Sequence, residues 1–297
     1  MQWNLVGAFR RNFPFGTEIA FKKGLERLGE TVNTIDPCYP NQVFDEAADV
    51  TLVFKCIDPG PYLDALKRLG GIKIVYQPDD LRLSYIEQSM KEVAEYCQFA
   101  LVFDSDGAKI ASTLGYKIAE HLLLTADDTL YRRIPGIQKD IDVCFIGHFG
   151  PGPHHKSRTR MIEIVSKMKG IKFIAHMGLY DIAKLNEIYN RSKIVLNHAT
   201  DVGQAFGTGY GYQCRHFEAG FTGACVLTNK VLNNDIIKNI VCFESENSLV
   251  ENIRFLIQNT SERVGWGEGL YEEMIGSHKP EHRAQQLIDF VKRAQCV

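Results

Sequence analysis

The stretch TADDTLYRRIPGIQKD (125–140) interrupts a regular alternation of apolar runs and amphipathic segments, and DVCFIG (142–147) restarts that alternation at once. On both sides of the break, short apolar runs take turns with helical patterns. This alternation predicts parallel sheets with helices on both faces. The position of the break predicts two α/β domains of similar size, 1–135 and 136–297.

The two halves contain comparable elements. In the first half, strands are expected at 2–9, 30–35, 49–54, 72–77 and 99–104, with helices at 17–29 and 84–97. In the second half, strands are expected at 142–147, 171–175, 193–197, 224–228 and 239–243, with helices at 157–168, 180–191, 213–221 and 246–258. A terminal helix at 282–294 is assigned to the second domain, although the sequence does not show which surface it covers.

The composition describes an ordinary globular chain and excludes several classes of protein. The chain has 297 residues, of which 45% are hydrophobic and 24% charged, and its net charge of −2 does not indicate a general nucleic-acid binder. No apolar run reaches the roughly 18 residues of a membrane span, and the N-terminus lacks a secretory pattern. Eight cysteines are scattered without CxxC pairs, which predicts buried thiols in a cytoplasmic protein.

Parallel α/β sheets bind ligands beyond the carboxyl ends of their strands, so loops that follow strands have priority. The loop GAFRRNFPFGTE (7–18) leads into the first helix. Gly16 and Thr17 open that helix, with Thr17 expected as its N-cap. The free N–H groups of such a helix start favour phosphate or sugar oxygens, while a plain turn and cap is the alternative.

The loop GHFGPGPHHKSRTR (147–160) has the corresponding place in the second half. It begins with Gly147 and His148 and carries Lys156, Arg158 and Arg160, a cationic set suited to a diphosphate. A solvated helix face is the alternative for the two arginines. The spacing is not that of a Walker loop, and no Cys or carboxylate near the histidines completes a metal site.

Two acidic residues follow a strand in YQPDD (76–80). Asp79 and Asp80 would stand at the carboxyl end of that strand, where a general base or a sugar-binding carboxylate belongs. Adjacent acids after proline are also common turn residues, so both interpretations stay open.

The segment GTGYGYQCRHFEAGFTGACVLT (207–228) contains two separate signals. Its glycines do not follow a strand directly, so they fail the context that a dinucleotide fingerprint requires and read as a flexible approach to the next helix. Arg215 and Glu218 are three residues apart and share a helix face. Arginine can neutralise a diphosphate and a carboxylate can accept the hydroxyls of a ribose, while a plain ion pair is the alternative.

The second half resembles the group 1 glycosyltransferases of the GT-B fold, in particular their spore-maturation-protein-type branch. The resemblance covers roughly residues 140–290 and rests on an ordered set of motifs: DVCFIGHFG (142–150), LNEIYNRSKIVLNHA (185–199), RHFEAGFTGACVLTN (215–229), ENSLVENIRFLIQN (246–259) and SHKPEHRAQQL (277–287). The first half matches only in its general α/β pattern and in LLTADDTLY (123–131).

This resemblance implies two Rossmann-like domains facing a cleft, with a nucleotide-diphosphate sugar, UDP-linked, held mainly by the second. It implies Glu218 on the nucleotide ribose and Arg215 near the diphosphate, with Tyr210 and Gly211 beside the donor. Many retaining relatives have a glutamate where this chain has Tyr210, so the paired-glutamate pattern is broken. The family generally needs no cofactor or metal, because cationic side chains and helix N-termini stabilise the leaving diphosphate.

The acceptor is not readable from the sequence, and a saccharide, a protein or a modified DNA base are all compatible with it. FRRNFPF (9–15) interleaves arginines with aromatic residues, a pattern that could contact a DNA strand. Tyr210 in place of a glutamate also leaves open a module that binds a nucleotide sugar without turnover.

Overall fold

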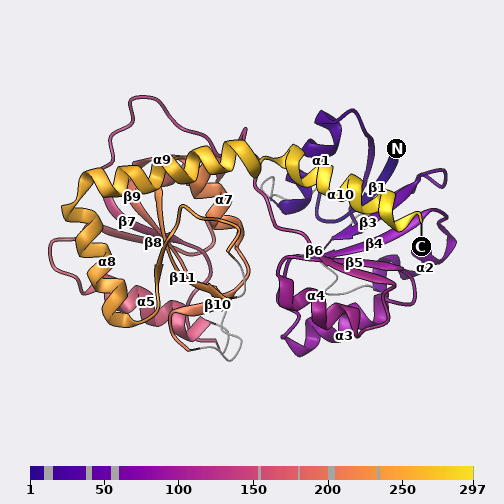
Figure 1. The fold of residues 1–297 in the computed structure, drawn as a ribbon, viewed down its shortest axis with the longest axis horizontal. Helices are drawn as coiled ribbons and strands as arrows, with labels where there is room; N and C mark the ends of the chain where they lie inside the picture. The colour runs from indigo at the N-terminus through magenta and orange to yellow at the C-terminus, as the bar shows by residue number, and fades with distance from the viewer. Residues whose placement is uncertain are drawn as a thin grey trace. The chain divides into compact units, whose positions relative to one another are not determined.

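The structure is a computed structural model that describes residues 1–9, 16–37, 42–54, 60–152, 155–179, 181–199, 205–232 and 235–296. The chain divides into two compact units, Met1–Asp127 together with Lys279–Val297, and Asp128–His278. Each unit contains one six-stranded sheet whose strands are all parallel (Figure 1). In the part of the chain that is described, no helix is long and apolar enough to cross a membrane.

The sheet of the first unit has the strand order β2-β1-β3-β4-β5-β6. Its central strands β3 to β5 are buried at almost every position, which is why they read as continuous apolar runs. The strands are β1 (Gln2–Val6), β2 (Thr31–Ile35), β3 (Val50–Phe54), β4 (Ile72–Gln77), β5 (Phe99–Val102) and β6 (Ile118–His121). The helices are α1 (Thr17–Arg27), α2 (Gly60–Arg68), α3 (Ser84–Val93) and α4 (Ser105–Ser112).

The C-terminal helix α10 (Pro280–Ala294) belongs to the first unit, which differs from the predicted boundaries of 1–135 and 136–297. Figure 1 shows α10, at the yellow end of the chain, beside α1. The approach is close at Gly24, where an added Cβ would lie 2.3 Å from the carbonyl oxygen of Pro280. The sequence shows that α10 has an apolar face but does not show which surface this face covers. The prediction therefore assigned the helix to the second domain, which precedes it in the chain.

The sheet of the second unit has the order β10-β11-β9-β7-β8, with β12 also paired to β11. Side chains from β7, β9 and β11 form its core together with apolar residues of α5 and α8. The strands are β7 (Ile141–Ile146), β8 (Phe173–His176), β9 (Ser192–Asn197), β10 (Thr208–Tyr210), β11 (Cys225–Leu232) and β12 (Val241–Phe243). The helices are α5 (Lys156–Ser166), α6 (Ile182–Arg191), α7 (Cys214–Phe221), α8 (Glu246–Gln258) and α9 (Thr260–Ser277).

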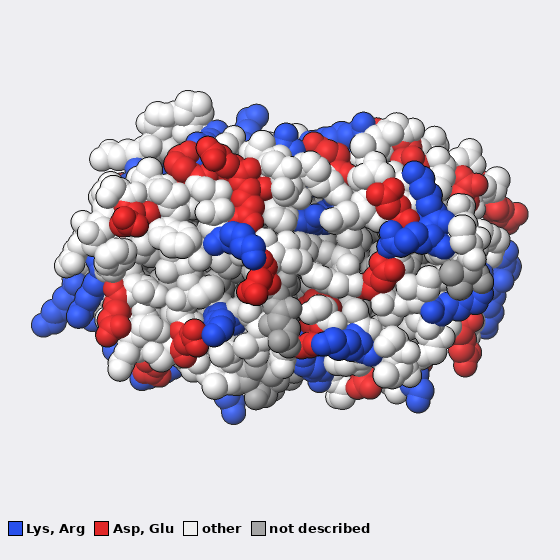
Figure 2. Space-filling model, in the orientation of Figure 1, with Lys and Arg blue, Asp and Glu red and all other residues white. Residues whose placement is uncertain are grey.

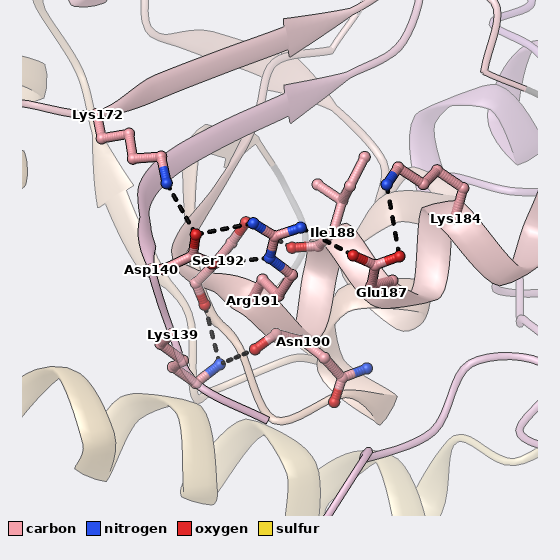
Figure 3. Close-up of polar contacts among 9 residues, drawn as sticks. All are labelled: Lys139, Asp140, Lys172, Lys184, Glu187, Ile188, Asn190, Arg191 and Ser192. Carbon is pink, nitrogen blue, oxygen red and sulfur yellow. Dashed lines mark hydrogen bonds and ion pairs between the residues drawn. The ribbon is translucent and has the colours of Figure 1, made fainter. Parts of the chain in front are cut away.

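An ion-pair network fastens the entry of β7 to the end of α6 (Figure 3). Asp140 pairs with Arg191 at 2.7 Å and with Lys172 at 2.8 Å, and their hydrogen bonds hold the pKa of its carboxyl well below the usual range. Lys139 donates to the backbone carbonyls of Asn190 and Ser192 at 3.1 and 2.9 Å. The segment that leads from the first unit into β7 is therefore fixed at this end.

Five elements were not anticipated from the sequence: α2, α4, β6, α9 and β10. The helix α9 contains three glycines in five residues, Gly265, Gly267 and Gly269, which hide its pattern. Gly267 is needed there, because an added Cβ would lie 2.7 Å from the carbonyl oxygen of Gly223. Tertiary packing thus overrides the low helix propensity of glycine in α9.

The glycine run at 207–211 is a strand and not the flexible approach that the sequence suggested. Thr208–Tyr210 forms β10, which pairs with β11 in parallel. An added Cβ at Gly209 would lie 2.4 Å from the side-chain nitrogen of Asn229 and 2.5 Å from the Cβ of Ala199. Gly209 therefore allows β10 to lie close to its neighbours, a requirement that the sequence pattern does not reveal.

Candidate functional site

The sheet of the second unit has its topological switch point between β7 and β9, because β8 and β9 lie on opposite sides of β7. The loops that leave the carboxyl ends of β7 and β9 diverge there, which is where open α/β sheets bind ligands. Three predicted residues meet at this point: Gly147 directly after β7, and Arg215 and Glu218 on α7.

The guanidinium of Arg215 is oriented by both of these strands. It lies 4.8 Å over the ring of Phe145 in β7, and its Nη1 donates a hydrogen bond to the side-chain oxygen of Asn197 at the end of β9. Gly147 makes room for it, since an added Cβ would lie 2.2 Å from Nη2. The buried Nε of Arg215 has no hydrogen-bond partner among the described residues. Arg215 thus presents a fixed cation at the switch point.

Glu218 makes no ion pair with Arg215 within the described residues, so the plain intrahelical pair that their spacing allows is not formed. Its Oε2 accepts a hydrogen bond of 3.0 Å from the hydroxyl of Tyr189 on α6. Burial raises the pKa of Glu218, while the positive charge of Arg215 and the hydroxyls of Tyr189 and Tyr131 act in the opposite direction.

A buried polar group supports the ends of β9 and β11 beneath Arg215. The amide of Asn197 donates to the hydroxyl of Thr228 at 3.0 Å, and Nε2 of His216 lies 3.2 Å from the same hydroxyl. Burial lowers the pKa of His216 to about 4, so the imidazole is neutral. The group therefore orients Asn197, and through it Arg215, without adding a second charge.

The structure separates the roles of the two arginines predicted on α5. Arg158 is buried, and its donors go to the backbone carbonyls of His148 (2.8 Å) and His198 (2.8 and 3.2 Å), which ties the loops after β7 and β9 together. Arg160 is exposed and forms a two-pronged ion pair with Glu246 on α8, at 2.8 Å for both contacts. Neither guanidinium is directed freely into solvent at the switch point.

A surface depression of about 730 Å³ lies along the same loop and the start of α5. Its lining residues are Gly150, Pro151, Gly152, Lys156, Thr159, Arg160 and Glu163. The exposed Lys156 forms no ion pair with any described residue. His148 is also exposed. Arg158 is bound to backbone carbonyls and Arg160 to Glu246, so Lys156 is the predicted α5 cation for which the described residues provide no such partner.

Tyr210 and Gly211 lie at the end of β10, directly before α7. Tyr210 is half-buried and Gly211 is buried with a φ of +63°, a conformation that favours glycine. The glutamate found here in many members of the resembled family is thus replaced by a partly buried phenol ring on an edge strand.

In the first unit, the start of α1 differs from the prediction in one detail. Gly16 is the N-cap and makes no side-chain cap, and Thr17 is the buried first residue of the helix, so Thr17 is not the N-cap. No sequence pattern singled out Glu18, which is 2% exposed and whose buried Oε2 has no hydrogen-bond partner among the described residues. It folds over Gly16, where an added Cβ would lie 2.5 Å from Oε2.

The two predicted acids after β4 have different surroundings. Asp80 is buried and pairs with Arg82 at 2.5 Å, and Arg82 also pairs with Asp104 at 2.8 Å, the side chain that caps α4. Asp80 is therefore part of a structural ion-pair group. Asp79 is half-buried, and its negative charge contributes, after burial, to a raised pKa of Tyr85.

Within the described ranges, no cluster of His, Cys, Asp and Glu could hold a metal ion. His154 and residues 10–15 of the aromatic and basic stretch lie outside the described residues. On the face drawn in Figure 2, basic and acidic side chains are mixed in small groups and do not gather into one basic stripe.

Comparisons with known proteins agree with this architecture. Residues 155–289 match the model of a family described as glycosyl transferase-like, and this stretch contains Arg215 and Glu218. No match was found among curated proteins. Among solved structures, HepE of Anabaena in complex with UDP and glucose is similar at 10% identity and a TM-score of 0.67, over 99% of this chain and 100% of that chain.

Two further structures are similar over nearly the whole chain. Sucrose-phosphate synthase of Thermosynechococcus elongatus has 9% identity and a TM-score of 0.66, over 100% of this chain and 99% of that chain. An E. coli trehalose-6-phosphate structure bound with UDP-2-fluoro glucose has 8% identity and a TM-score of 0.67, over 98% and 99%. At these identities the likeness is one of fold. The chain has two Rossmann-like domains of the GT-B type.

Proposed function

We propose that the chain is a glycosyltransferase that transfers a sugar from a UDP-linked nucleotide-diphosphate sugar held by the second unit. The observation that carries the proposal is the pairing at the switch point of a fixed cation, Arg215, with a carboxylate, Glu218, whose Oε2 is held by the hydroxyl of Tyr189. The family match over 155–289 supports it, and so do the UDP and UDP-sugar ligands of the similar structures.

In this proposal, Glu218 accepts hydrogen bonds from the ribose hydroxyls and Arg215 neutralises the diphosphate. A carboxylate suits a pair of hydroxyls because it only accepts, and a guanidinium suits phosphate oxygens because of its forked donors. Arg215 would also stabilise the charge that grows on the leaving diphosphate, which is the largest electrostatic demand of such a reaction. We propose on this basis that transfer needs no bound metal and no cofactor.

The remaining donor contacts are proposed from position. Gly147 and His148 would approach the diphosphate with their backbone, and Lys156 would add a second cation at the start of α5. Arg158 would act indirectly by holding the loop in place, and Arg160 through its contact with α8. Tyr210 and Gly211 would lie beside the sugar.

The acceptor side is proposed to lie in the first unit, at the carboxyl ends of β1 and β4. The backbone of Gly16 and Thr17 would bind phosphate or sugar oxygens of the donor at the start of α1, and the carboxylates of Glu18 and Asp79 would accept from an acceptor hydroxyl. Asp80 keeps a structural role in this assignment, because Arg82 already neutralises it.

Two finer assignments rest on the sequence. The ordered motifs from 142 to 287 favour the spore-maturation-protein-type branch of the glycosyltransferases. Cys144 and Cys225 are buried and form no disulfide among the described residues, as expected for a reducing compartment, which favours a cytoplasmic enzyme.

The test combines donor binding with turnover. UDP is titrated into the wild type and into Arg215→Ala and Glu218→Ala variants, and hydrolysis or transfer of UDP-glucose is followed with the same proteins. Each variant is expected to bind UDP about 10- to 100-fold more weakly, because hydrogen bonds to charged groups contribute about 1.5–3 kcal/mol. Glu251→Ala, an exposed glutamate on α8 of the same unit, is the matched control and is expected to behave as wild type.

Unchanged UDP affinity in both site variants would remove the site assignment. UDP-dependent thermal stabilisation of the wild type without any product would instead favour a binding module over an enzyme.

A further inference from the structure

The carboxylate of Glu218 lies between two buried tyrosines that come from different parts of the second unit. Tyr189 is on α6, and Tyr131 is in the segment that leads from the first unit to β7. Their side chains are 1% and 0% exposed, and their ring centroids are 6.3 Å apart. Neither residue was singled out for a role by the sequence motifs.

Tyr189 fixes one side of the carboxylate. Its hydroxyl donates to Oε2 of Glu218 at 3.0 Å, its one hydrogen bond to a described residue. A hydrogen bond to one carboxylate oxygen selects a single side-chain rotamer and leaves the other oxygen, Oε1, to accept from a ligand.

Tyr131 stands beside the same carboxylate. The negative charge of Glu218 adds to burial in raising the pKa of Tyr131, but the contact between its hydroxyl and the carboxylate falls short of a regular hydrogen bond among the described residues. A buried hydroxyl without a partner is costly, commonly by about 1–3 kcal/mol. It therefore points to a small shift of the Glu218 carboxylate on binding, which would complete the hydrogen bond.

The position of Tyr131 is determined by its neighbours in sequence. The backbone N–H groups of Arg132 and Ile134 donate to the side chains of Asn186 (3.0 Å) and Asn190 (2.8 Å) on α6. The amide of Asn190 donates back to the carbonyl of Arg132 at 2.9 Å. The same helix that carries Tyr189 thus anchors the segment that carries Tyr131.

We propose that Tyr189 and Tyr131 are positioning residues that hold the Glu218 carboxylate so that its free oxygen accepts from the ribose hydroxyls of the donor. This inference rests on the proposed function and adds to it the residues that make the ribose contact possible. Neither tyrosine touches the reacting atoms in this assignment.

The charges around Glu218 explain why such support is needed. An ionised carboxylate is the better acceptor of hydrogen bonds from the ribose hydroxyls, but burial favours the neutral acid. Arg215 from α7 and the hydroxyls of Tyr189 and Tyr131 favour the ionised form. Cys214 on α7 and Cys144 on β7 also face this group, and burial raises the pKa of Cys144 to about 12, so that thiol is neutral.

The test compares two ligands that differ only in the ribose hydroxyls, UDP and 2′,3′-dideoxy-UDP, by calorimetric titration. In the wild type UDP is expected to bind about tenfold or more tightly than the dideoxy ligand. In Tyr189→Phe the ratio of the two affinities is expected to fall about tenfold, to near one, and in Tyr131→Phe several-fold. Each variant removes only a hydroxyl, so the ring keeps its packing. Affinity for the dideoxy ligand is expected to stay as in wild type.

The pH profile of the same ratio separates positioning from a general structural effect. The ratio is expected to fall as pH falls through the pKa of Glu218, because the protonated acid accepts poorly. Loss of the Tyr189 hydroxyl raises that pKa, so the fall is expected at higher pH in Tyr189→Phe. Titration of the phosphates is common to both ligands and cancels in the ratio.

Tyr116→Phe is the matched control. Tyr116 is a buried tyrosine of the first unit whose hydroxyl donates to the carbonyl of Met90, and its loss is expected to leave the ratio unchanged. Wild type that does not distinguish the two ligands would overturn the ribose assignment of Glu218 and this inference with it. Wild type that distinguishes them, with both tyrosine variants equal to wild type in ratio and pH profile, would overturn this inference alone. Should Tyr189→Phe fail to fold, the ratio in Tyr131→Phe decides by the same criterion.

Discussion

Gly147 offers a way to displace Arg215 without changing Arg215 itself. An alanine Cβ at this position would lie 2.2 Å from Nη2 and 3.2 Å from Cζ of Arg215. Ordinary van der Waals contact begins near 3.4 Å, so the guanidinium would have to move by about 1 Å or more. Such a shift removes its hydrogen bond to Asn197 and its place over Phe145.

The expected magnitude follows from the contact that the displaced cation would lose. A hydrogen bond to a charged group contributes about 1.5–3 kcal/mol, and about 1.4 kcal/mol corresponds to a factor of ten in Kd. Gly147→Ala is therefore expected to weaken UDP binding roughly 10- to 100-fold. Uridine has no diphosphate, so its affinity is expected to stay as in wild type.

Calorimetric titration of both ligands measures this effect, and Gly150→Ala is the control from the same loop. Gly147 and Gly150 both have a positive φ, +155° and +121°, so each alanine strains the backbone, but an added Cβ at Gly150 meets no atom within 4 Å. In the double variant Gly147→Ala, Arg215→Ala, the affinity for UDP is expected to equal that of Arg215→Ala alone, because the Cβ then meets no guanidinium. UDP affinity within twofold of wild type in Gly147→Ala, or an additive loss in the double variant, would refute the reasoning.

Three further predictions concern the framework of the second unit. Arg158→Met keeps the length of the side chain but leaves two backbone carbonyls without their donors. Urea unfolding is expected to show a free energy of unfolding lower by about 2–4 kcal/mol. A decrease below about 1 kcal/mol would contradict a structural role. Gly209→Ala forces β10 against Asn229, with an expected cost of about 1–3 kcal/mol; a melting temperature equal to that of wild type would show that the strand can yield. Asp140→Asn removes a carboxyl whose pKa is depressed in the folded state. Its contribution is present above the unfolded pKa of about 3.9 and is lost as pH falls through the lower folded value. The variant is therefore expected to be less stable than wild type at pH 7, with a difference that shrinks toward pH 2 and in high salt, and a pH-independent difference would contradict this assignment.

The sequence predicted the parts of the fold that depend on local pattern. Buried parallel strands such as β3, β9 and β11 read as apolar runs because helices cover both faces of the sheet, and the loops after them could be located for that reason. The short strand β10 was not predictable in this way. Its three residues include Gly209, which is selected by a close approach to Asn229 and Ala199, and such an approach exists only in the folded unit.

The candidate site also has a part that local sequence pattern predicts and a part that it does not. Spacing alone placed Arg215 and Glu218 on one face of α7, as the structure has them. Spacing could not show that Glu218 accepts a hydrogen bond from Tyr189 and that Arg215 donates one to Asn197, because these partners come from α6 and β9. The tyrosine does stand in the sequence pattern that resembles the family, so a signal was present, but nothing in the pattern said where its hydroxyl points.

The number of basic residues in the loop at 147–160 does not show how many of them could contact a ligand. The loop and helix start at 147–160 carry Lys156, Arg158 and Arg160, and from the sequence all three are equal candidates for a diphosphate. In the fold, Arg158 is bound to backbone carbonyls of the loops after β7 and β9, and Arg160 is bound to Glu246 on α8. The charge that remains for a ligand comes from Lys156 and from Arg215, which is distant in sequence and is brought to the same loop by the packing of α7 against Gly147. The proposed diphosphate site would therefore depend on the sheet topology, and a substitution at Gly147 is expected to affect it more than one at Arg160, although only Arg160 carries a charge.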